Sequence, residues 1–192
     1  MRRVAVALLT AFLVALLIAM HPLDARATTT CTDTLTADSG NVVTSDVDVP
    51  AGASCTASGL NIYGNITIEQ GGTFTLEGGQ LSGNVTADAG SAFFAGGATI
   101  AGNVLTGDAA AIGIDNVTMN GNVIADSVGS ISLTNSTLSG NIQAQTGMGT
   151  FVIYNNTING NIDVGWVDAS VAIMGNTING NAICNNSACP MS

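Results

Sequence analysis

The chain has 192 residues and a formal net charge of −10 at neutral pH, with three basic residues and one histidine. Arg2, Arg3, Arg26 and His21 all lie before Thr28. The rest of the chain cannot neutralise phosphates, which excludes nucleic acid and disfavours anionic membranes as partners. It also cannot build Ser-His-Asp or Cys-His sites or His-ligated zinc. The remaining possibilities for this part of the chain are chemistry by carboxylates, metal binding through oxygen ligands, or no catalytic chemistry. We expect no cofactor.

Residues 1–27 are predicted to be a secretory signal peptide. Two arginines precede an apolar run over residues 4–20, and Ala25-Arg26-Ala27 is a small-x-small cleavage site. The run is short for a membrane span, which needs about 20 residues. Cleavage after Ala27 is therefore favoured over a retained anchor, and we expect a protein that is secreted, extracellular or at the cell surface.

Residues 28–58 hold the first copy of a pattern that recurs down the chain. The stretch "VDVPAGASCT" (47–56) aligns with "ITIEQGGTFT", which follows one period later. This alignment places Cys55 in the column of Phe74 and Val43 in the column of Ile62. A solenoid needs closed ends, so this segment is expected to form an N-terminal cap and the first coil.

Residues 59–183 repeat a Gly-Asn pair with a period of about 19–20 residues, as expected of a solenoid. The glycines of these pairs are Gly64, Gly83, Gly102, Gly121, Gly140, Gly160 and Gly180. Apolar residues alternate around each pair, which indicates short strands with one buried face. Returning to the same column at a fixed period predicts a β-helix, and the crossover rule favours the right-handed form. The predicted fold is all-β: a single-domain right-handed parallel β-helix of about eight coils.

Each Gly-Asn pair is predicted to be a corner, with glycine allowing the tight bend. The neighbouring asparagines would stack into a ladder through their side-chain amides. The ladder residues are Asn65, Asn84, Asn103, Asn122, Asn141, Asn161 and Asn181.

Residues 184–192 are expected to form the C-terminal cap. Four cysteines in an exported chain suggest two disulfides, for which three pairings exist. About eight coils, or roughly 30 Å, separate the chain ends. This separation favours Cys31–Cys55 and Cys184–Cys189 over the other pairings and over a shared metal site.

The opening "VPAGASC", the repeated "GN(I/V)" corners and the closing "NTINGNAIC" resemble a group of secreted bacterial β-helix proteins of unknown function. This resemblance implies fold and export and carries no activity. Similarity to the polymer-forming bactofilin β-helices is weaker. Those proteins are cytosolic and lack a signal peptide and disulfides, so their cytoskeletal role is not carried over.

Two outward columns are candidate sites. A flat strip of threonines precedes the corners, at Thr99, Thr118, Thr137, Thr157 and Thr177. Such a strip could bind ice, or it could reflect the high β-propensity of threonine. Glu69, Asp88 and Asp126 form a weaker carboxylate column that calcium could occupy, although Gly107 and Gln145 interrupt it. Otherwise these carboxylates are solvated turn residues.

The sequence favours a non-enzymatic secreted β-helix with a structural, cell-surface or extracellular role. Its partners would be further copies of itself, an extracellular surface or a glycan. The alternatives are a binding module, for ice through the threonine strip or for glycan, and a carboxylate-based glycosidase. Aromatic sugar platforms are nearly absent, since besides phenylalanine the chain after Ala27 has only Trp166, Tyr63 and Tyr154, which speaks against the glycosidase.

Overall fold

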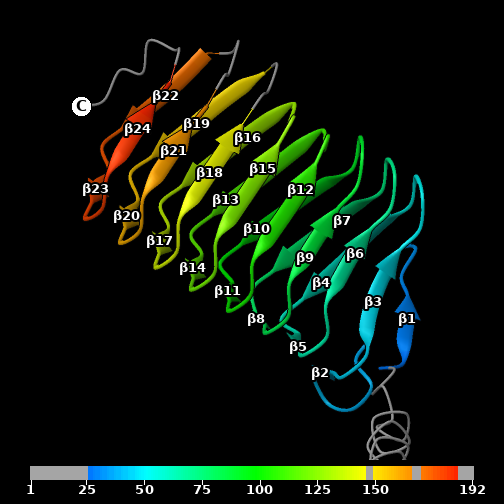
Figure 1. The fold of residues 1–192 in the computed structure, drawn as a ribbon. Coiled ribbons are helices and arrows are strands. Elements are labelled where there is room, and N and C mark those ends of the chain that lie inside the picture. Colours follow the sequence, from blue (N-terminus) through cyan, green and yellow to red (C-terminus); the bar gives the residue numbers. More distant parts are fainter. Residues whose placement is uncertain (1–25, 146–148, 166–169, 186–192) are drawn as a thin grey trace, which may run out of the picture.

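A computed structural model of the protein describes residues 26–145, 149–165 and 170–185. Three parallel sheets wind along one axis, from the blue N-terminal coil to the red C-terminal coil in Figure 1. Over those ranges there is no helix. The predicted all-β, parallel β-helix fold of about eight coils is therefore confirmed.

The three sheets, here named A, B and C, each contain equivalent strands from successive coils. Sheet A consists of β1 (Thr28–Thr30), β3 (Asp46–Val49), β6 (Ile66–Ile68), β9 (Val85–Ala87), β12 (Val104–Gly107), β15 (Val123–Asp126), β18 (Ile142–Gln145), β21 (Ile162–Val164) and β24 (Ala182–Cys184). Sheet B consists of β4 (Ser54–Ser58), β7 (Thr73–Glu77), β10 (Ala92–Gly96), β13 (Ala111–Asp115), β16 (Ser130–Thr134), β19 (Thr150–Tyr154) and β22 (Ser170–Met174). Sheet C consists of β2 (Val42–Val43), β5 (Asn61–Ile62), β8 (Gln80–Leu81), β11 (Thr99–Ile100), β14 (Thr118–Met119), β17 (Thr137–Leu138), β20 (Thr157–Ile158) and β23 (Thr177–Ile178).

One coil passes from sheet C through sheet A to sheet B, and every pairing between neighbouring strands of a sheet is parallel. The register keeps the repeat columns together: Cys55 pairs with Phe74 and Val43 with Ile62, as predicted. The extra residue of the later repeats enters between sheets A and B. There the offset between paired residues lengthens by one position, after the pairing of Asp126 with Gln145 and before that of Ser130 with Thr150.

The interior is filled by the inward side chains of all three sheets. Alternation along the strands buries every second residue, as in β7, where Phe74 and Leu76 are fully buried between less buried neighbours. Phe74 and Phe93 stack one coil apart, with ring centroids 6.4 Å apart and planes 9° from parallel. Residues in one column thus pack on their equivalents in the next coil, which buries apolar area without a second layer.

The turn from sheet B to sheet C uses a left-handed residue at the same place in each coil. The residues of this column are Gly59, Gly78, Gly97, Asn116, Asn135, Asn155 and Gly175, with φ between 52° and 68°. Glycine and asparagine are the residues that enter this region most readily. Every position of this column is therefore occupied by either glycine or asparagine.

The corner glycines have a different role from the one predicted. None of them has a positive φ, so they are not needed for a strained bend. A Cβ placed on Gly83, Gly102 or Gly121 would instead collide with the backbone carbonyl of the glycine one coil earlier. The corner requires glycine because successive coils approach too closely there for any side chain.

Candidate functional site

The corner asparagines form a continuous ladder along the β-helix. Each side-chain Oδ1 accepts hydrogen bonds from the backbone N–H and from the Nδ2 of the asparagine one coil later. The backbone bonds measure 2.8–3.0 Å and the amide–amide bonds 2.9–3.4 Å, from Asn65 to Asn181. The asparagines themselves are half-buried or exposed rather than deeply buried.

Asp46 begins this ladder at the N-terminal end. Its Oδ1 accepts from the backbone N–H of Asn65 at 2.7 Å and from the Asn65 Nδ2 at 3.3 Å. A carboxylate can only accept, whereas an amide must also donate. The first position lacks an earlier acceptor in the ladder, so a carboxylate suits it better than an amide does.

A second, buried polar ladder of Ser136, Asn156 and Asn176, here called the inner ladder, was missed by the sequence analysis. Asn156 is only 3% exposed, and its Nδ2 donates to Leu133 O at 2.9 Å and to Asn176 Oδ1 at 3.0 Å. Its Oδ1 accepts from the backbone N–H of Ser136 at 2.8 Å. Ser136 continues the ladder, because its Oγ accepts from Val117 N at 3.0 Å. These bonds satisfy the backbone at the turn between sheets B and C.

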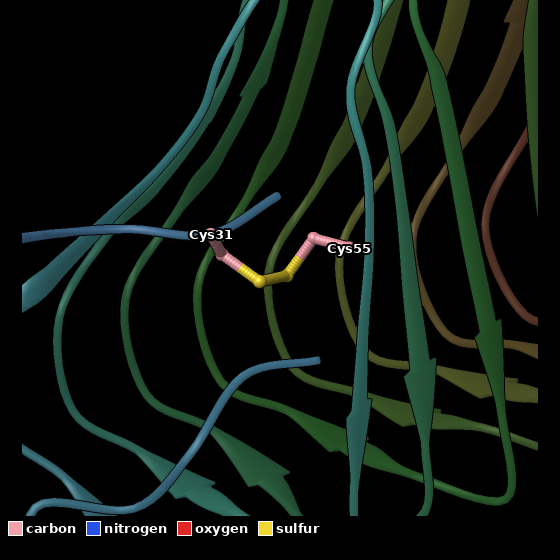
Figure 2. The surroundings of a disulfide bond; sticks show 2 residues. All are labelled: Cys31 and Cys55. Carbon is pink, nitrogen blue, oxygen red and sulfur yellow. A yellow bond between two sulfur atoms is a disulfide. The ribbon is translucent and has the colours of Figure 1, made fainter. Parts of the chain in front are cut away.

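The disulfide between Cys31 and Cys55 is confirmed, with Cα atoms 5.6 Å apart. Figure 2 shows the bridge joining the segment that follows β1 to β4. Both cysteines are buried, and Leu35, 4% exposed, packs in the same cluster. Backbone hydrogen bonds from Cys31 N to Asp48 O and from Leu35 N to Thr56 O hold this segment against sheet A and sheet B, respectively. It covers the N-terminal end of the core.

The predicted C-terminal bridge is described only in part. Cys184, in β24, is disulfide-bonded. Its predicted partner Cys189 lies outside the described residues, as do residues 186–192 of the predicted cap and residues 1–25 of the predicted signal peptide.

The predicted threonine strip lies on the outer side of sheet C. Thr99, Thr118, Thr137, Thr157 and Thr177 are direct partners in neighbouring strands. Thr99 is half-buried and the other four are exposed. The five residues form one in-register row, with a spacing of about 4.8 Å between neighbouring strands. A regular row of hydroxyls and methyl groups could bind a periodic surface.

The predicted carboxylate column is not brought together as a metal site. Glu69 directs its Oε2 back to the backbone N–H of Ala51, at 3.0 Å. Gly107 pairs with Asp126 and separates it from Asp88, so these two carboxylates are two coils, or about 10 Å, apart. In the described ranges no group of three or more acidic, histidine or cysteine residues is arranged to hold a metal.

Three carboxyl groups have shifted pKa values. Burial and, secondarily, the charge of Glu69 raise the pKa of Asp48. The Thr134 hydroxyl at 2.6 Å and the Asn135 amide at 2.9 Å lower the pKa of Asp115. Backbone and hydroxyl hydrogen bonds from Thr44 lower the pKa of Asp38. Of these groups, Asp48 beside Glu69 comes nearest to the carboxylate pair of a glycosidase.

The outer surface of the described ranges carries at least two shallow hollows. One, of about 570 Å³, lies beside sheet A and is lined by Leu105 and Ile124 together with Asp88 and Asp108. The other, of about 310 Å³, lies on sheet B around Phe94 and Gly113. Neither is lined by Asp48 or Glu69. The sequence analysis predicted neither hollow, although Phe94, an outward phenylalanine between Thr75 and Gly113 in its column, was a signal for the second.

The fold and these ladders define the chain as a parallel β-solenoid with a disulfide-closed N-terminal end. In comparisons with family models, curated proteins and solved structures, none matches the chain. No described helix is long and apolar enough to cross a membrane.

Proposed function

We propose that the protein is exported and acts as a non-enzymatic structural element at the cell surface or in the extracellular space. The observation that carries this proposal is the role of its acidic side chains. Asp46, Glu69, Glu77 and Asp115 all accept hydrogen bonds from the neighbouring coil. These four carboxylates therefore contribute to the coil-to-coil scaffold.

Two further features support export. The strand β1 begins at Thr28, immediately after the predicted cleavage site at Ala27. The Cys31–Cys55 disulfide closes the first coil, and structural disulfides persist in oxidising compartments. The absence of Lys, Arg and His after Ala27 gives a uniformly acidic rod, whose self-repulsion favours solubility.

Fractionation of the native culture, with mass spectrometry of the N-terminus, tests this proposal. We expect a chain that begins at Thr28, lies outside the cytoplasm and has oxidised Cys31 and Cys55. An intact chain beginning at Met1 in the cytoplasm, with reduced cysteines, would refute export. Purified protein should also release no reducing sugar from a panel of polysaccharides.

Ice binding through sheet C is the second candidate, and the in-register threonine row favours it. Thermal hysteresis that disappears in Thr137→Tyr would support this function. Thr67→Tyr is the matched control, because Thr67 is an exposed strand threonine on sheet A. Equal loss in both variants, or no hysteresis in the parent protein, would argue against an ice-binding face.

A carboxylate-based glycosidase has less support. The raised pKa of Asp48, next to the charge of Glu69, is the observation in its favour. Against it, the Glu69 carboxylate bonds to the backbone of Ala51, and neither hollow is lined by this pair. Sugar release that is abolished by Glu69→Gln in a folded variant would establish the enzyme and overturn the structural role.

A further inference from the structure

The hollow on sheet B lies where two neighbouring strands each have a glycine, so that no side chain fills the space. Gly96 in β10 and Gly113 in β13 both contribute to its lining, and the hollow measures about 310 Å³. The ring of Phe94 leans over Gly113: a Cβ at Gly113 would lie 2.6 Å from Phe94 Cδ1. The hollow is therefore bounded by the Phe94 ring and by backbone without side chains at Gly96 and Gly113.

Phe94 is unusual among the phenylalanines that the structure describes. Phe74, Phe93 and Phe151 are buried in the core, whereas Phe94 is 40% exposed. Its partners across the sheet are Thr75 and Gly113, so no large apolar neighbour in its own column covers it. The exposed ring offers a flat apolar face to a ligand in the hollow.

Polar groups line the other sides of the hollow. Glu77 accepts from Ser58 on Oε2, at 2.9 Å. Asp115 accepts from Thr134 and from Asn135 on Oδ1. Because each carboxylate receives these bonds on one oxygen, its second oxygen can accept from a ligand. Charge-assisted hydrogen bonds of this kind are about twice as strong as neutral ones.

We propose that this hollow is a binding subsite for a neutral polysaccharide. A pyranose ring with equatorial hydroxyls has a flat face of C–H groups, which would pack on Phe94, and hydroxyl groups at its edge, which would donate to Glu77 and Asp115. An aromatic platform with a few convergent polar groups is the usual form of a small-ligand site.

The negative charge around the hollow disfavours anionic glycans. No basic residue follows Ala27, and the two carboxylates beside the hollow repel sulfated or carboxylated chains. Anionic glycans are therefore excluded, and the proposal names an uncharged chain such as a cello-oligosaccharide or an N-acetylated chito-oligosaccharide. This proposal goes beyond the structural role. Binding is measured on purified protein, so its failure would leave the export test unaffected.

Titration calorimetry of the purified protein with cellohexaose and with hexa-N-acetylchitohexaose, which are both neutral, tests the subsite. We expect binding of at least one of them, about a tenfold or larger loss of affinity in Phe94→Ala, and retained binding in Phe94→Trp. Tyr63→Ala is the matched control, because Tyr63 is 49% exposed and lies at the corner beside β5, away from sheet B. Circular dichroism should show that all variants stay folded.

Three results would overturn the proposal. The first is that neither oligosaccharide binds the parent protein, and the second is that Phe94→Ala binds as tightly as the parent. The third is that Tyr63→Ala loses as much affinity as Phe94→Ala, which indicates non-specific contact with aromatic groups. Tighter binding of an oligogalacturonate than of the neutral chains would contradict the charge argument directly.

Discussion

The phrase "NTINGN" at residues 156–161 contains three asparagines, and the structure assigns them three different environments. Asn156 is buried in the inner ladder, Asn161 lies in the corner ladder, and Asn159 is exposed. Removing each side chain in turn should therefore have three different costs. This series separates the two ladders within one short segment.

Asn156→Leu should cost about 3 kcal/mol, because it removes several hydrogen bonds from a buried site. The two hydrogens of Nδ2 are shared among three acceptors, Leu133 O, Tyr154 O and Asn176 Oδ1, and Oδ1 accepts one bond from Ser136 N. Each such bond contributes about 1 kcal/mol, and a buried group left without a partner costs more. The apolar surface that the leucine buries offsets part of this loss.

The two other asparagines give smaller expected effects. Asn161→Ala removes one donated bond, to Asn141 Oδ1, and two accepted from Asn181, all in a solvent-exposed corner. Water replaces part of these, so we expect about 1–2 kcal/mol. Asn159→Ala removes the single bond from Asn179 Nδ2, and we expect less than about 1 kcal/mol.

Urea unfolding followed by circular dichroism measures these costs as shifts of the transition midpoint. The expected order of destabilisation is Asn156→Leu, then Asn161→Ala, then Asn159→Ala. If Asn156→Leu were as mild as Asn159→Ala, the buried amide would not hold the coils together, and the inner ladder would have no energetic role.

Three further changes test other parts of the account. Thr106→Val should stabilise the protein by about 1 kcal/mol in urea unfolding, because the buried Thr106 Oγ1 has no hydrogen-bond partner; a destabilised variant would mean that the hydroxyl is satisfied. Gly121→Ala should cost about 3 kcal/mol, since its Cβ meets the Gly102 carbonyl, whereas Gly96→Ala, with open space at its Cβ, should be nearly neutral. Asp115→Ala should lower the urea midpoint at pH 7. The difference from the parent should shrink as the pH falls below about 3.8, because a carboxyl whose pKa is lowered in the folded state stabilises the fold only while it is ionised. A difference that did not depend on pH would refute this role of the carboxylate.

The coil architecture could be predicted because every coil must satisfy the same packing and hydrogen-bonding requirements. Each coil must place glycine where backbones touch, an acceptor amide beside it and apolar residues inward. These requirements leave the same marks at a regular interval along the sequence. The register of Cys55 with Phe74 followed directly from that period. The physical reason for the glycines did not, because a sequence does not show which backbone atoms approach each other between coils.

The inner ladder and the sheet B hollow were harder to predict. In the column of Asn156 the earlier coils carry apolar residues such as Leu60 and Val117, both buried, so no single residue type repeats along it. The hollow depends on Phe94 leaning over Gly113, a side-chain orientation that periodicity does not determine. A column that changes from apolar residues to serine and asparagine was the available signal for the inner ladder.

Spin-label distances along sheet C test the central geometric claim most directly. Cysteines introduced in pairs at Thr99 and Thr157, at Thr99 and Thr177, and at Asn61 and Thr177 are three, four and six coils apart in one column. At about 4.8 Å per coil, backbone separations of about 14, 19 and 29 Å are expected, and the label distances should rise in the same steps. Distances that did not rise steadily with the number of coils would contradict a stacked parallel β-helix.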